Sequence, residues 1–413
     1  MLIIGVNYAP EHTGIAPYST GMAAGLAKLG YWVEVITSQP HYPQWRIQSG
    51  YKKWTLKESK SEVKIRRLFH YVPMAPKGIR RLFSEITFGA RVVSSRWPRP
   101  SVIVLVSPAM ISSAMAMVKA KFLHRNVPTV LWVQDLYAMG VAETGQGGGL
   151  AFKIISTTEG WLLRKADVVV VIHNRFAQRI AKDYGVEPER ISVVRNWSHT
   201  HSVEVEENQS IRSELGWQSD ELVVLHTGNM GVKQGLGNVI EAARLADARR
   251  ARIRFVLMGD GGERKSLENE ATGIERIDFV EPVDADTYSN MLKAADILLV
   301  NELAGVSEMA VPSKLTSYFQ SGTAVLVATD LEGITAEEVR TAGAGVVVAS
   351  GRPEELLNAA IELGSDKRAL KEFGAKGQIY AKVFLSEDAA IQKFKTEIVE
   401  KLLSREASAR RND

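Results

Sequence analysis

The chain has 413 residues, of which 45% are hydrophobic and 24% charged, and its formal net charge is +4 at pH 7. At roughly 150 residues per domain, this is enough apolar material for two packed domains. The sequence contains no cysteine, which excludes a disulfide scaffold, a thiolate zinc site and a cysteine nucleophile. A net charge this close to zero indicates no particular class of partner.

The N-terminal segment 1–7 is apolar but short, and it has neither the basic start nor the cleavage site of a signal peptide. We therefore expect it to form a first strand. No apolar stretch approaches the roughly 20 residues that a membrane-spanning helix needs. Together with the lack of cysteine, these features predict a cytoplasmic protein.

In the first half of the chain, short apolar runs alternate with helical patterns. Residues 18–29 predict a helix that is closed by Gly30 in the C′ position. Strands are expected at 2–6, 32–37, 63–68, 102–106, 129–133 and 168–172.

The alternation begins again after a polar stretch at 197–208. Continuous β-branched strands separated by helices are typical of parallel sheets covered on both faces. The sequence therefore predicts an α/β protein of two Rossmann-like, doubly wound domains, residues 1–200 and 208–385, which face each other across a ligand-binding cleft. Residues 389–403 predict an amphipathic helix, and the polar tail 404–413 predicts disorder. The strands of the second half are expected at 222–225, 254–258, 277–280, 297–300, 324–328 and 345–348.

A glycine-rich loop at 227–236 carries one lysine, Lys233, between a predicted strand and a helical pattern at 238–245. Glycines let backbone N–H groups approach an anion, and a helix N-terminus adds unpaired donors and partial positive charge. The loop therefore suits a phosphate. A tight strand–helix turn with a surface lysine would show the same pattern, so both interpretations stay open.

The loop 7–18 follows the first strand and is long for a strand–helix connection. It lacks the pattern Gly-x-Gly-x-x-Gly, so it is not a dinucleotide-binding motif. Gly14 could let backbone amides approach an anion or a sugar. An ordinary turn glycine is the alternative.

Ser313 and Lys314 precede a helical stretch that ends near Gly322. Ser313 suits the N-cap, and Lys314 then falls in the first turn, where a cation opposes the helix dipole. A bound anion would remove this conflict. The alternative is a lysine that points to solvent.

Two short patterns resemble metal-binding signatures. Asp284-Ala285-Asp286 has the spacing of an Asp-x-Asp site, but it follows a proline and begins a helical pattern, which favours helix capping. His199 and His201 have no third ligand nearby and lie in a polar segment that predicts an interdomain linker. We therefore expect no metal site.

Residues 77–99 combine basic side chains with apolar and aromatic ones at helical spacing. An interfacial helix on an anionic membrane has this composition, and so does a helix with one core-facing side and one solvated basic side. Binding of single-stranded nucleic acid is disfavoured, because the rest of the chain is nearly neutral. The basic residues are Lys77, Arg80, Arg81, Arg91, Arg96 and Arg99.

Taken together, several segments in one order resemble the family-4 retaining glycosyltransferases, which have the B fold of two Rossmann domains. The resemblance covers nearly the whole chain. It is nearest to the enzymes that build bacterial exopolysaccharides such as colanic acid, a branch with fucosyl- and N-acetylfucosaminyl-transferases. The matching segments are residues 7–15, 42–45, 134–135, 195–198, 228–236 and 312–315.

This resemblance implies a nucleotide-sugar site. Gly14 would lie against the donor diphosphate, Lys233 would pair with it, and residues 386–403 would pack back onto the N-terminal domain. The implied catalytic residues are Lys233, Glu308 and Asp135. The implied donor-binding residues are Gly14, Gly228, Asn229, Gly231, Lys233, Gln234, Gly259, Ser313 and Lys314.

Some positions depart from the family pattern. Asn229 replaces a common arginine of the phosphate loop, and Gln134 replaces a histidine. Met309 and Ser317 stand where the family has paired glutamates. Glu308, one residue away, could hold a hydroxyl of the donor sugar.

The resemblance predicts a retaining glycosyltransferase that moves a sugar from a UDP- or GDP-linked donor to a lipid-linked or saccharide acceptor in bacterial surface polysaccharide synthesis. It would require no metal or other cofactor, because a lysine and helix dipoles would balance the diphosphate charge. It would act at the cytoplasmic face of the inner membrane, in contact with anionic lipid through residues 77–99. A nucleotide-sugar epimerase or hydrolase of the same fold and a two-domain sugar-binding protein are the alternatives.

Overall fold

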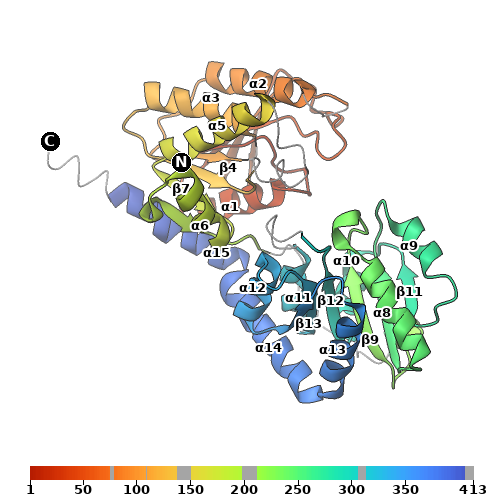
Figure 1. Cartoon of the computed structure of the whole chain (residues 1–413). Coiled ribbons are helices and arrows are strands. Elements are labelled where there is room, and N and C mark those ends of the chain that lie inside the picture. The colour runs from red at the N-terminus through yellow and green to blue at the C-terminus, as the bar shows by residue number, and fades with distance from the viewer. Residues whose placement is uncertain (75–78, 108, 137–149, 198–211, 306–312, 405–413) are drawn as a thin grey trace. The chain divides into compact units, whose positions relative to one another are not determined.

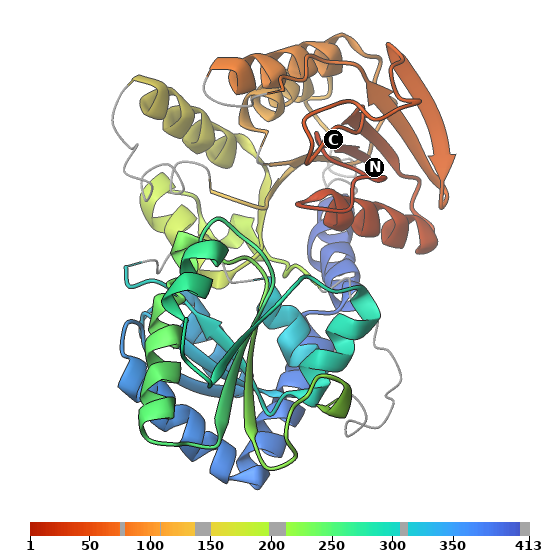
Figure 2. The ribbon, with the colours of Figure 1, turned by 90° about the vertical axis from the view of Figure 1, so that its right-hand side faces the viewer.

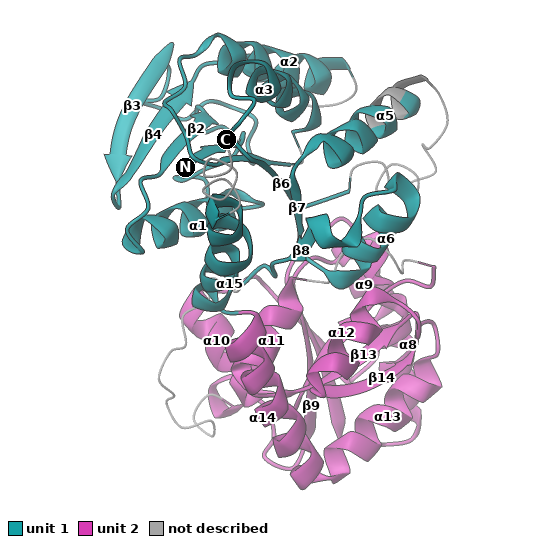
Figure 3. Ribbon diagram, turned by 90° about the vertical axis from the view of Figure 1, so that its left-hand side faces the viewer, with its two compact units in different colours: residues 1–197, 386–413 teal, residues 198–385 magenta. Residues whose placement is uncertain are grey.

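The computed structural model describes residues 1–74, 79–107, 109–136, 150–197, 212–305 and 313–404. The chain divides into two compact units (Figures 1 and 3). One unit joins residues 1–197 to residues 386–413, and the other holds residues 198–385. Each unit is built around a sheet that is mainly or wholly parallel, so the predicted α/β class with two Rossmann-like domains is confirmed.

The sheet of the first unit has the strand order β3-β4-β2-β1-β5-β6-β7-β8. Neighbouring strands are parallel except β3 and β4, which pair antiparallel at one edge of the sheet (Figure 2). The strands are β1 Leu2–Ile4, β2 Glu34–Ser38, β3 Thr55–Lys60, β4 Val63–Leu68, β5 Ile103–Val106, β6 Thr129–Val133, β7 Val168–Val171 and β8 Ile191–Val193.

The antiparallel strand β3 is not among the strands that the sequence predicts. Its side chains are mostly exposed, and it pairs with β4 alone. An edge strand of this kind needs no continuous apolar run, and its charged side chains protect the sheet edge. The expectation of purely parallel sheets was therefore wrong at this edge.

Helix α1, Ala16–Lys28, ends at a left-handed glycine, as predicted. Gly30 has φ +90°, and its N–H donates to the carbonyl of Ala27 at 2.8 Å. Glycine adopts this conformation without strain, so Gly30 terminates the helix. Further helices of this unit are α2 Ile79–Ser94, α3 Met110–Leu123, α5 Leu150–Lys165, α6 Asn174–Tyr184 and α15 Glu387–Phe394.

The C-terminal helix α15 packs closely against α1. A Cβ on Gly25 of α1 would lie 2.1 Å from Ile391 Cδ1, so a larger residue would require the Ile391 side chain to move. Ile391 and Phe394 are buried in the core beneath α1. The segment predicted as one helix at 389–403 includes a π-helical stretch, Lys395–Glu400.

The sheet of the second unit has the order β11-β10-β9-β12-β13-β14, and all its neighbouring strands are parallel. Every strand predicted here is present, with bounds that differ by no more than two residues. The strands are β9 Leu222–Thr227, β10 Ile253–Met258, β11 Ile277–Val280, β12 Ile297–Asn301, β13 Ala324–Thr329 and β14 Gly345–Ala349. The helices are α8 Gly237–Ala248, α9 Arg264–Glu270, α10 Ala285–Ala294, α11 Lys314–Ser321, α12 Ile334–Ala342, α13 Pro353–Ser365 and α14 Lys367–Phe384.

Alternate residues of β9 enter two different apolar cores. Val224 packs in the core beneath α8 and α13, whereas Val223 and Leu225 pack in the core beneath α10, α11 and α14. Both faces of the sheet are therefore buried, which is why its strands are continuous apolar runs.

The first strand of each unit occupies the same place in its sheet. β1 lies between β2 and β5, and β9 lies between β10 and β12. At such a position the strand order reverses, so the chain connections on the two sides of the strand run in opposite directions. This opens a crevice at the carboxyl ends of the strands. The candidate sites are therefore the loops that follow β1 and β9.

Candidate functional site

The glycine loop connects β9 to α8 in the order that the sequence predicts. Gly228 has φ +104° and Gly235 has φ +54°, which other residues adopt only with strain. Between them, Val232–Gln234 forms a single 3-10 turn. Gly228, Asn229 and Lys233 are exposed, so the surface of the loop is accessible to a ligand.

Asn301, at the end of β12, holds the loop in this conformation. Asn301 is 1% exposed, and its amide donates to the carbonyls of Gln234 at 2.8 Å and Gly235 at 3.0 Å. The N–H of Leu303 donates to the carbonyl of Lys233 at 2.9 Å. These bonds fix the backbone that carries the Lys233 side chain, and a fixed charge needs little reorganisation to meet an anion.

Three of the expected donor-binding residues contact one another within the loop. Gln234 Oε1 accepts hydrogen bonds from Gly231 N at 3.1 Å and from Asn229 Nδ2 at 3.3 Å. Gln234 therefore shapes the loop through its side-chain oxygen.

Gly259 follows β10 and packs directly against the glycine loop. It has φ +140°, and a Cβ here would lie 1.9 Å from Gly228 O. A Cβ on Gly261 would lie 2.4 Å from Met230 O, and Met230 N donates to the carbonyl of Asp260 at 2.9 Å. The two loops thus pack backbone against backbone, which requires glycine at both positions.

Lys314 begins α11 and reaches the underside of the glycine loop. Its Nζ lies 3.1 Å from His226 Nε2, and a Cβ on Gly228 would lie 3.8 Å from that Nζ. The alternative of a solvent-directed lysine is therefore wrong. Ser313 occupies the N-cap position, but its backbone is αR and its side chain makes no capping bond. The prediction of a capping serine was wrong, because an N-cap side chain acts from extended backbone.

The groups around Lys314 make its charge sensitive to the environment. His226 is fully buried and its Nδ1 lies 3.1 Å from Leu299 O, so Nε2 accepts from Lys314. Burial and the Lys314 charge hold the pKa of His226 well below its ordinary value. Burial lowers the pKa of Lys314 to about 7, while the Glu302 carboxylate opposes this shift. A bound anion would favour the protonated lysine.

Glu302 lies just after β12 and is tied to the next strand and helix. Its carboxylate accepts hydrogen bonds from Thr329 and from Thr335 Oγ1, the latter at 3.0 Å. Burial raises its pKa. Sequence reasoning missed His226, Asn301 and Glu302, although a polar residue that ends an apolar strand is a usable signal in a parallel sheet.

The first unit has a cavity of about 330 Å³ at the carboxyl ends of its strands. It brings together Gly14, Gln134 and Asp135, and Arg81 of the basic segment also lines it. Gly14 has φ +63° and stands close to the Tyr42 ring, 3.3 Å from where a Cβ would be. Asp135 is exposed, whereas Gln134 is buried.

Glu11 organises the loops on one side of this cavity. It is 4% exposed, and its Oε1 accepts from the backbone N–H groups of His41 at 2.7 Å and Tyr42 at 2.8 Å. Its Oε2 accepts from Asn7 Nδ2 at 2.8 Å. One carboxylate thus joins the loop after β1 to the loop after β2. Charged acceptors with several N–H donors form strong hydrogen bonds.

Two buried histidines line the cavity edge to face. The ring centroids of His41 and His70 are 5.2 Å apart, and His41 Nδ1 lies 2.9 Å from Gln39 O. Burial, reinforced by the neighbouring His41, lowers the pKa of His70 to about 3, so its imidazole is neutral. Neutral imidazoles can both donate to and accept from a hydroxyl.

Several polar atoms around this cavity have no partner within the described residues. They include His70 Nδ1 and Gln134 Nε2, both buried. Gln134 Oε1 accepts from Asn196 Nδ2 at 2.9 Å. Buried groups of this kind are costly unless a ligand or water pairs with them, so the cavity suits a polar ligand.

Glu85 contributes a second carboxylate to the cavity, beside Asp135. It accepts from Ile111 N at 3.0 Å, near the start of α3, and Arg81 Nε lies 3.8 Å away. Burial raises the pKa of Glu85. Sequence reasoning missed Glu11, His41, His70 and Glu85, which lie on separate segments.

The aspartates at 284–286 cap a helix, as predicted. Asp284 Oδ1 accepts from the N–H groups of Asp286 and Thr287, both at 3.0 Å. Within the described part of the chain, no three His, Asp or Glu side chains gather as a metal site would require. Glu308 and the histidines at 199 and 201 lie outside the described residues.

Helix α2 has both a core side and an exposed apolar side. Phe88 and Val92 are buried, whereas Ile79 is 79% exposed and Phe83 57% exposed. The core-facing side of this helix is confirmed, and contact with a membrane stays a prediction. Among the described helices, none has the length and apolar character needed to cross a bilayer.

Two doubly wound units, one with a glycine loop and lysines for an anion and one with a polar cavity, are the architecture of the B-fold glycosyltransferases. Residues 13–197 match the family model of the glycosyl transferase 4-like domain, and residues 207–379 match that of glycosyl transferases group 1. WcaI of Escherichia coli (strain K12), named as a colanic acid biosynthesis glycosyl transferase, is 32% identical over 348 residues. The alignment covers 79% of this chain and 83% of WcaI.

Solved structures share the fold over the whole length. Sucrose-phosphate synthase from Thermosynechococcus elongatus has a TM-score of 0.70 at 16% identity, and covers 98% of this chain and 99% of its own. Anabaena HepE in complex with UDP has a TM-score of 0.68 at 16% identity, and covers 98% and 100%. The chain belongs to the family-4 glycosyltransferases of the B fold. The predicted glycosyltransferase function is thereby confirmed over the epimerase and sugar-binding alternatives.

Proposed function

We propose that this glycosyltransferase takes its sugar from a nucleoside-diphosphate donor and transfers it with retention of configuration. The observation that carries the proposal is the convergence of Lys314 and the glycine loop. Lys314 Nζ would lie 3.8 Å from a Cβ on Gly228, at the underside of the glycine loop, and the exposed Lys233 belongs to the same loop. Two cations beside a glycine loop that is exposed at Gly228 and Asn229 suit a diphosphate.

The relatives support this class of donor. HepE of Anabaena has been solved with UDP and with UDP-glucose, and it shares the fold of this chain. We propose a UDP- or GDP-linked sugar for this protein. The remaining expected donor contacts are Gly14, Gly228, Asn229, Gly231, Gln234, Gly259 and Ser313.

In the proposed mechanism, the acceptor attacks the same face from which the diphosphate leaves. The leaving oxygen takes the acceptor proton, so no strong protein base is needed. Lys233 and Lys314 stabilise the negative charge that develops on the diphosphate. A metal ion is not required for this charge balance, and no further cofactor takes part.

On the acceptor side, we propose that the cavity of the first unit holds a saccharide. The neutral imidazole of His70, the cavity's carboxylates and Gln134 Nε2, which has no partner within the described residues, suit hydroxyl groups, which donate and accept. Asp135 would accept a hydrogen bond from the reacting hydroxyl and orient it. The role expected for Glu308, holding a donor-sugar hydroxyl, remains a prediction.

We further propose a lipid-linked or saccharide acceptor of bacterial surface polysaccharide synthesis, at the cytoplasmic face of the inner membrane. WcaI, which is named for colanic acid biosynthesis, supports this setting. The exposed apolar residues of α2, with Arg80 and Arg99 nearby, have the composition of a membrane-surface helix. The contact would be made by residues 77–99.

A thermal-shift series with UDP, GDP, ADP and TDP tests the donor. A diphosphate that binds the folded protein raises its melting temperature through linkage. The matching nucleotide sugar should then yield a product with the donor's anomeric configuration, read by the coupling constants in proton NMR. Inversion would refute the retaining mechanism, and no shift with any diphosphate would refute the donor class.

A further inference from the structure

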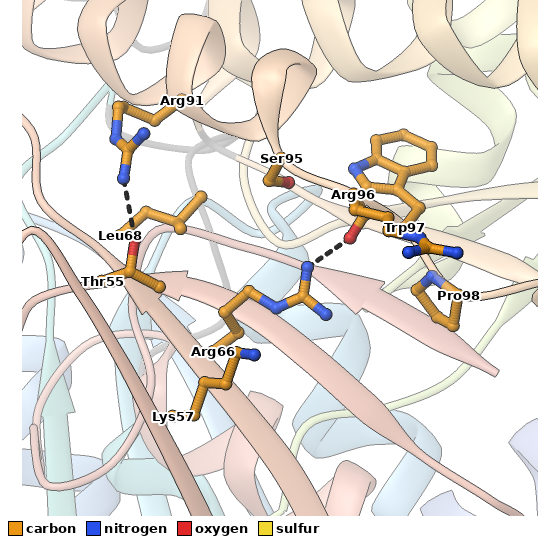
Figure 4. Close-up of a pocket in the computed structure, with 9 residues that line it drawn as sticks. All are labelled: Thr55, Lys57, Arg66, Leu68, Arg91, Ser95, Arg96, Trp97 and Pro98. Carbon is orange, nitrogen blue, oxygen red and sulfur yellow. Dashed lines mark hydrogen bonds between the residues drawn. The ribbon is translucent and has the colours of Figure 1, made fainter.

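A basic pocket lies between the C-terminal end of α2 and the β3–β4 hairpin (Figure 4). Its volume is about 370 Å³, and it lies outside the polar cavity described above. Four cationic side chains line it, and none of its lining residues is acidic. They are Lys57, Arg66, Arg91 and Arg96.

Only part of this pocket's positive charge has a carboxylate partner among the described residues. Lys57 and Arg66 stand directly opposite each other in the antiparallel register of β3 and β4, an arrangement of like charges that destabilises a sheet. Arg66 pairs with Glu34. Within the described residues, neither Lys57 nor Arg96 has a carboxylate within 4.0 Å. An anion would relieve this repulsion.

Two of the guanidinium groups are already held in place. Arg66 donates to the Glu34 carboxylate and to the carbonyl of Arg96. Arg91 Nη2 donates to the carbonyl of Trp54 and to Thr55 Oγ1, both at 2.9 Å. A guanidinium fixed in this way presents its remaining N–H groups as a fork that fits phosphate oxygens.

The end of helix α2 does not oppose an anion here. Helix carbonyls carry partial negative charge, but Lys119 Nζ donates to the carbonyls of Val93 at 2.8 Å and Ser95 at 2.5 Å. Burial lowers the pKa of Lys119, and the nearby charge of Arg66 lowers it further.

An apolar groove continues from the basic pocket along the same face of α2. Its volume is about 900 Å³, and Trp54, Phe69, Tyr71 and Met74 line it. Arg91 lines both hollows, and its guanidinium lies 3.9 Å from the centroid of the Trp54 ring. Ser94 lines the groove and the next residue, Ser95, lines the pocket, so the two hollows are adjacent.

We propose that the basic pocket and the apolar groove, together called the furrow, bind one phosphate-bearing lipid. Its phosphate would lie among the four cations and its apolar chain in the groove. A free phosphate or sugar phosphate would leave the aromatic groove without a role, whereas a lipid uses both hollows. The proposal deepens the membrane contact proposed above and rests on it. It assigns that membrane contact to a defined binding site for one lipid, where a general attraction between basic residues and an anionic surface would involve no such site.

The test uses the full chain and dioctanoyl phosphatidic acid below its micelle concentration. Lys57→Gln with Arg96→Gln removes two charges that face the pocket and make no side-chain bond within the described residues. The matched control, Lys53→Gln with Lys60→Gln, removes two exposed charges of the same hairpin region that lie outside the pocket. Calorimetry should show the pocket pair weakening binding by about tenfold or more, and the control pair changing it by about twofold at most.

Three further arms separate the sources of phosphate. Inorganic phosphate and dihexanoyl phosphatidic acid should bind more weakly than the dioctanoyl lipid, since a longer chain buries more apolar surface. Dioctanoyl phosphatidylcholine, which has no net charge, should bind weakly. Inorganic phosphate that binds as tightly as the lipid would overturn the lipid site, and so would equal losses in the two pairs or no binding of any probe.

The same variants separate this proposal from the donor proposal. Both pairs should keep the wild-type thermal shift with nucleoside diphosphate, because they lie in the first unit and the glycine loop lies in the second. Lipid binding without any diphosphate shift would refute the donor and leave the furrow standing. A diphosphate shift without lipid binding would refute the furrow alone.

Discussion

The candidate sites of the two units lie at equivalent ends of similar sheets, but one is made mainly of backbone groups and the other of side chains. In the second unit the site is largely backbone, with Gly228 and Gly259 in contact and Lys233 and Lys314 added as charges. In the first unit the site is made of side chains, such as His41 and the carboxylates that surround it. The backbone site of the second unit suits an anion, and the side-chain site of the first unit suits hydroxyl groups.

In the proposed mechanism, this difference separates the two tasks of a transferase. Stabilising a leaving diphosphate needs charge in a fixed position, which a glycine loop and a lysine supply whatever the sugar is. Recognising an acceptor needs a particular set of donors and acceptors, which only side chains can vary. Changes in the second unit should therefore affect the chemical step, and changes in the first should affect acceptor binding.

The largest expected effect is that of Lys233→Ala. Loss of a positioned charge on the developing anion should lower turnover by about a hundredfold, equivalent to about 3 kcal/mol. Nucleoside diphosphate binding should weaken as well, while the circular dichroism spectrum stays that of the wild type. Lys265→Ala, an exposed lysine of α9, is the matched control. Near wild-type turnover in Lys233→Ala would remove this lysine from the mechanism.

Glu11→Gln should affect the first unit next most strongly. The carboxylate accepts from two backbone N–H groups and one amide while almost fully buried. Its neutral replacement should lower the free energy of unfolding by about 2 kcal/mol. Urea denaturation measures this loss, and the exposed Glu189→Gln provides the control.

The comparison predicts how the kinetic effects of Glu11→Gln divide. The acceptor KM should rise because the loops at His41 and Tyr42 lose their anchor. Binding of nucleoside diphosphate should not change. A variant that loses diphosphate binding and keeps its acceptor KM would mean that the two tasks are not divided between the units in this way.

The pH dependence of diphosphate binding tests Lys314. Its pKa is about 7 in the free protein, and a bound anion raises it, so binding takes up a proton between the two values. Affinity should therefore fall as pH rises, by about tenfold between about pH 7 and about pH 9. Lys314→Met should bind more weakly and lack this slope, whereas Lys233→Met should keep it.

Calorimetry in two buffers of different ionisation enthalpy checks the proton directly. Wild-type binding at about pH 8 should take up a fraction of a proton, and Lys314→Met should take up less. Equal proton uptake in the two proteins would mean that another group, and not Lys314, responds to the anion.

The sequence predicted the fold well wherever burial dictates the pattern. Residues 129–133 coincide with β6, a fully buried strand with neighbours on two sides. It failed at β3 and β8, the two edge strands of the first unit, where no side chain is fully buried. The glycine loop could be predicted because backbone with positive φ favours glycine, so the conformation of the loop is visible in its sequence.

The side-chain site could be predicted only in part. Glu11 and His41 are joined by a hydrogen bond across a separation of 30 residues, and no local pattern reports such a contact. Gln134 could be singled out only through the family resemblance. At Ser313 the sequence predicted too much. Serine is a common N-cap residue, but the backbone of Ser313 is αR and its side chain makes no capping hydrogen bond.

The smallest expected effect belongs to the aspartates at 284–286, which lie in the second unit but serve its fold. Asp284→Ala removes the acceptor for two backbone N–H groups of α10 and should lower the urea midpoint slightly. The hydrogen bonds from Thr287 and Asp286 lower the pKa of Asp284, so this stabilisation is present at neutral pH and is lost as acid protonates the carboxylate. On the proposed mechanism, transfer should survive EDTA in the wild type and in the variant, because Lys233 and Lys314 would carry the charge that a metal ion would otherwise supply. Initial rates in chelator, with magnesium or manganese added back, decide the matter. A rate that falls to background in EDTA and returns with metal would show that two lysines and a glycine loop do not balance the diphosphate by themselves.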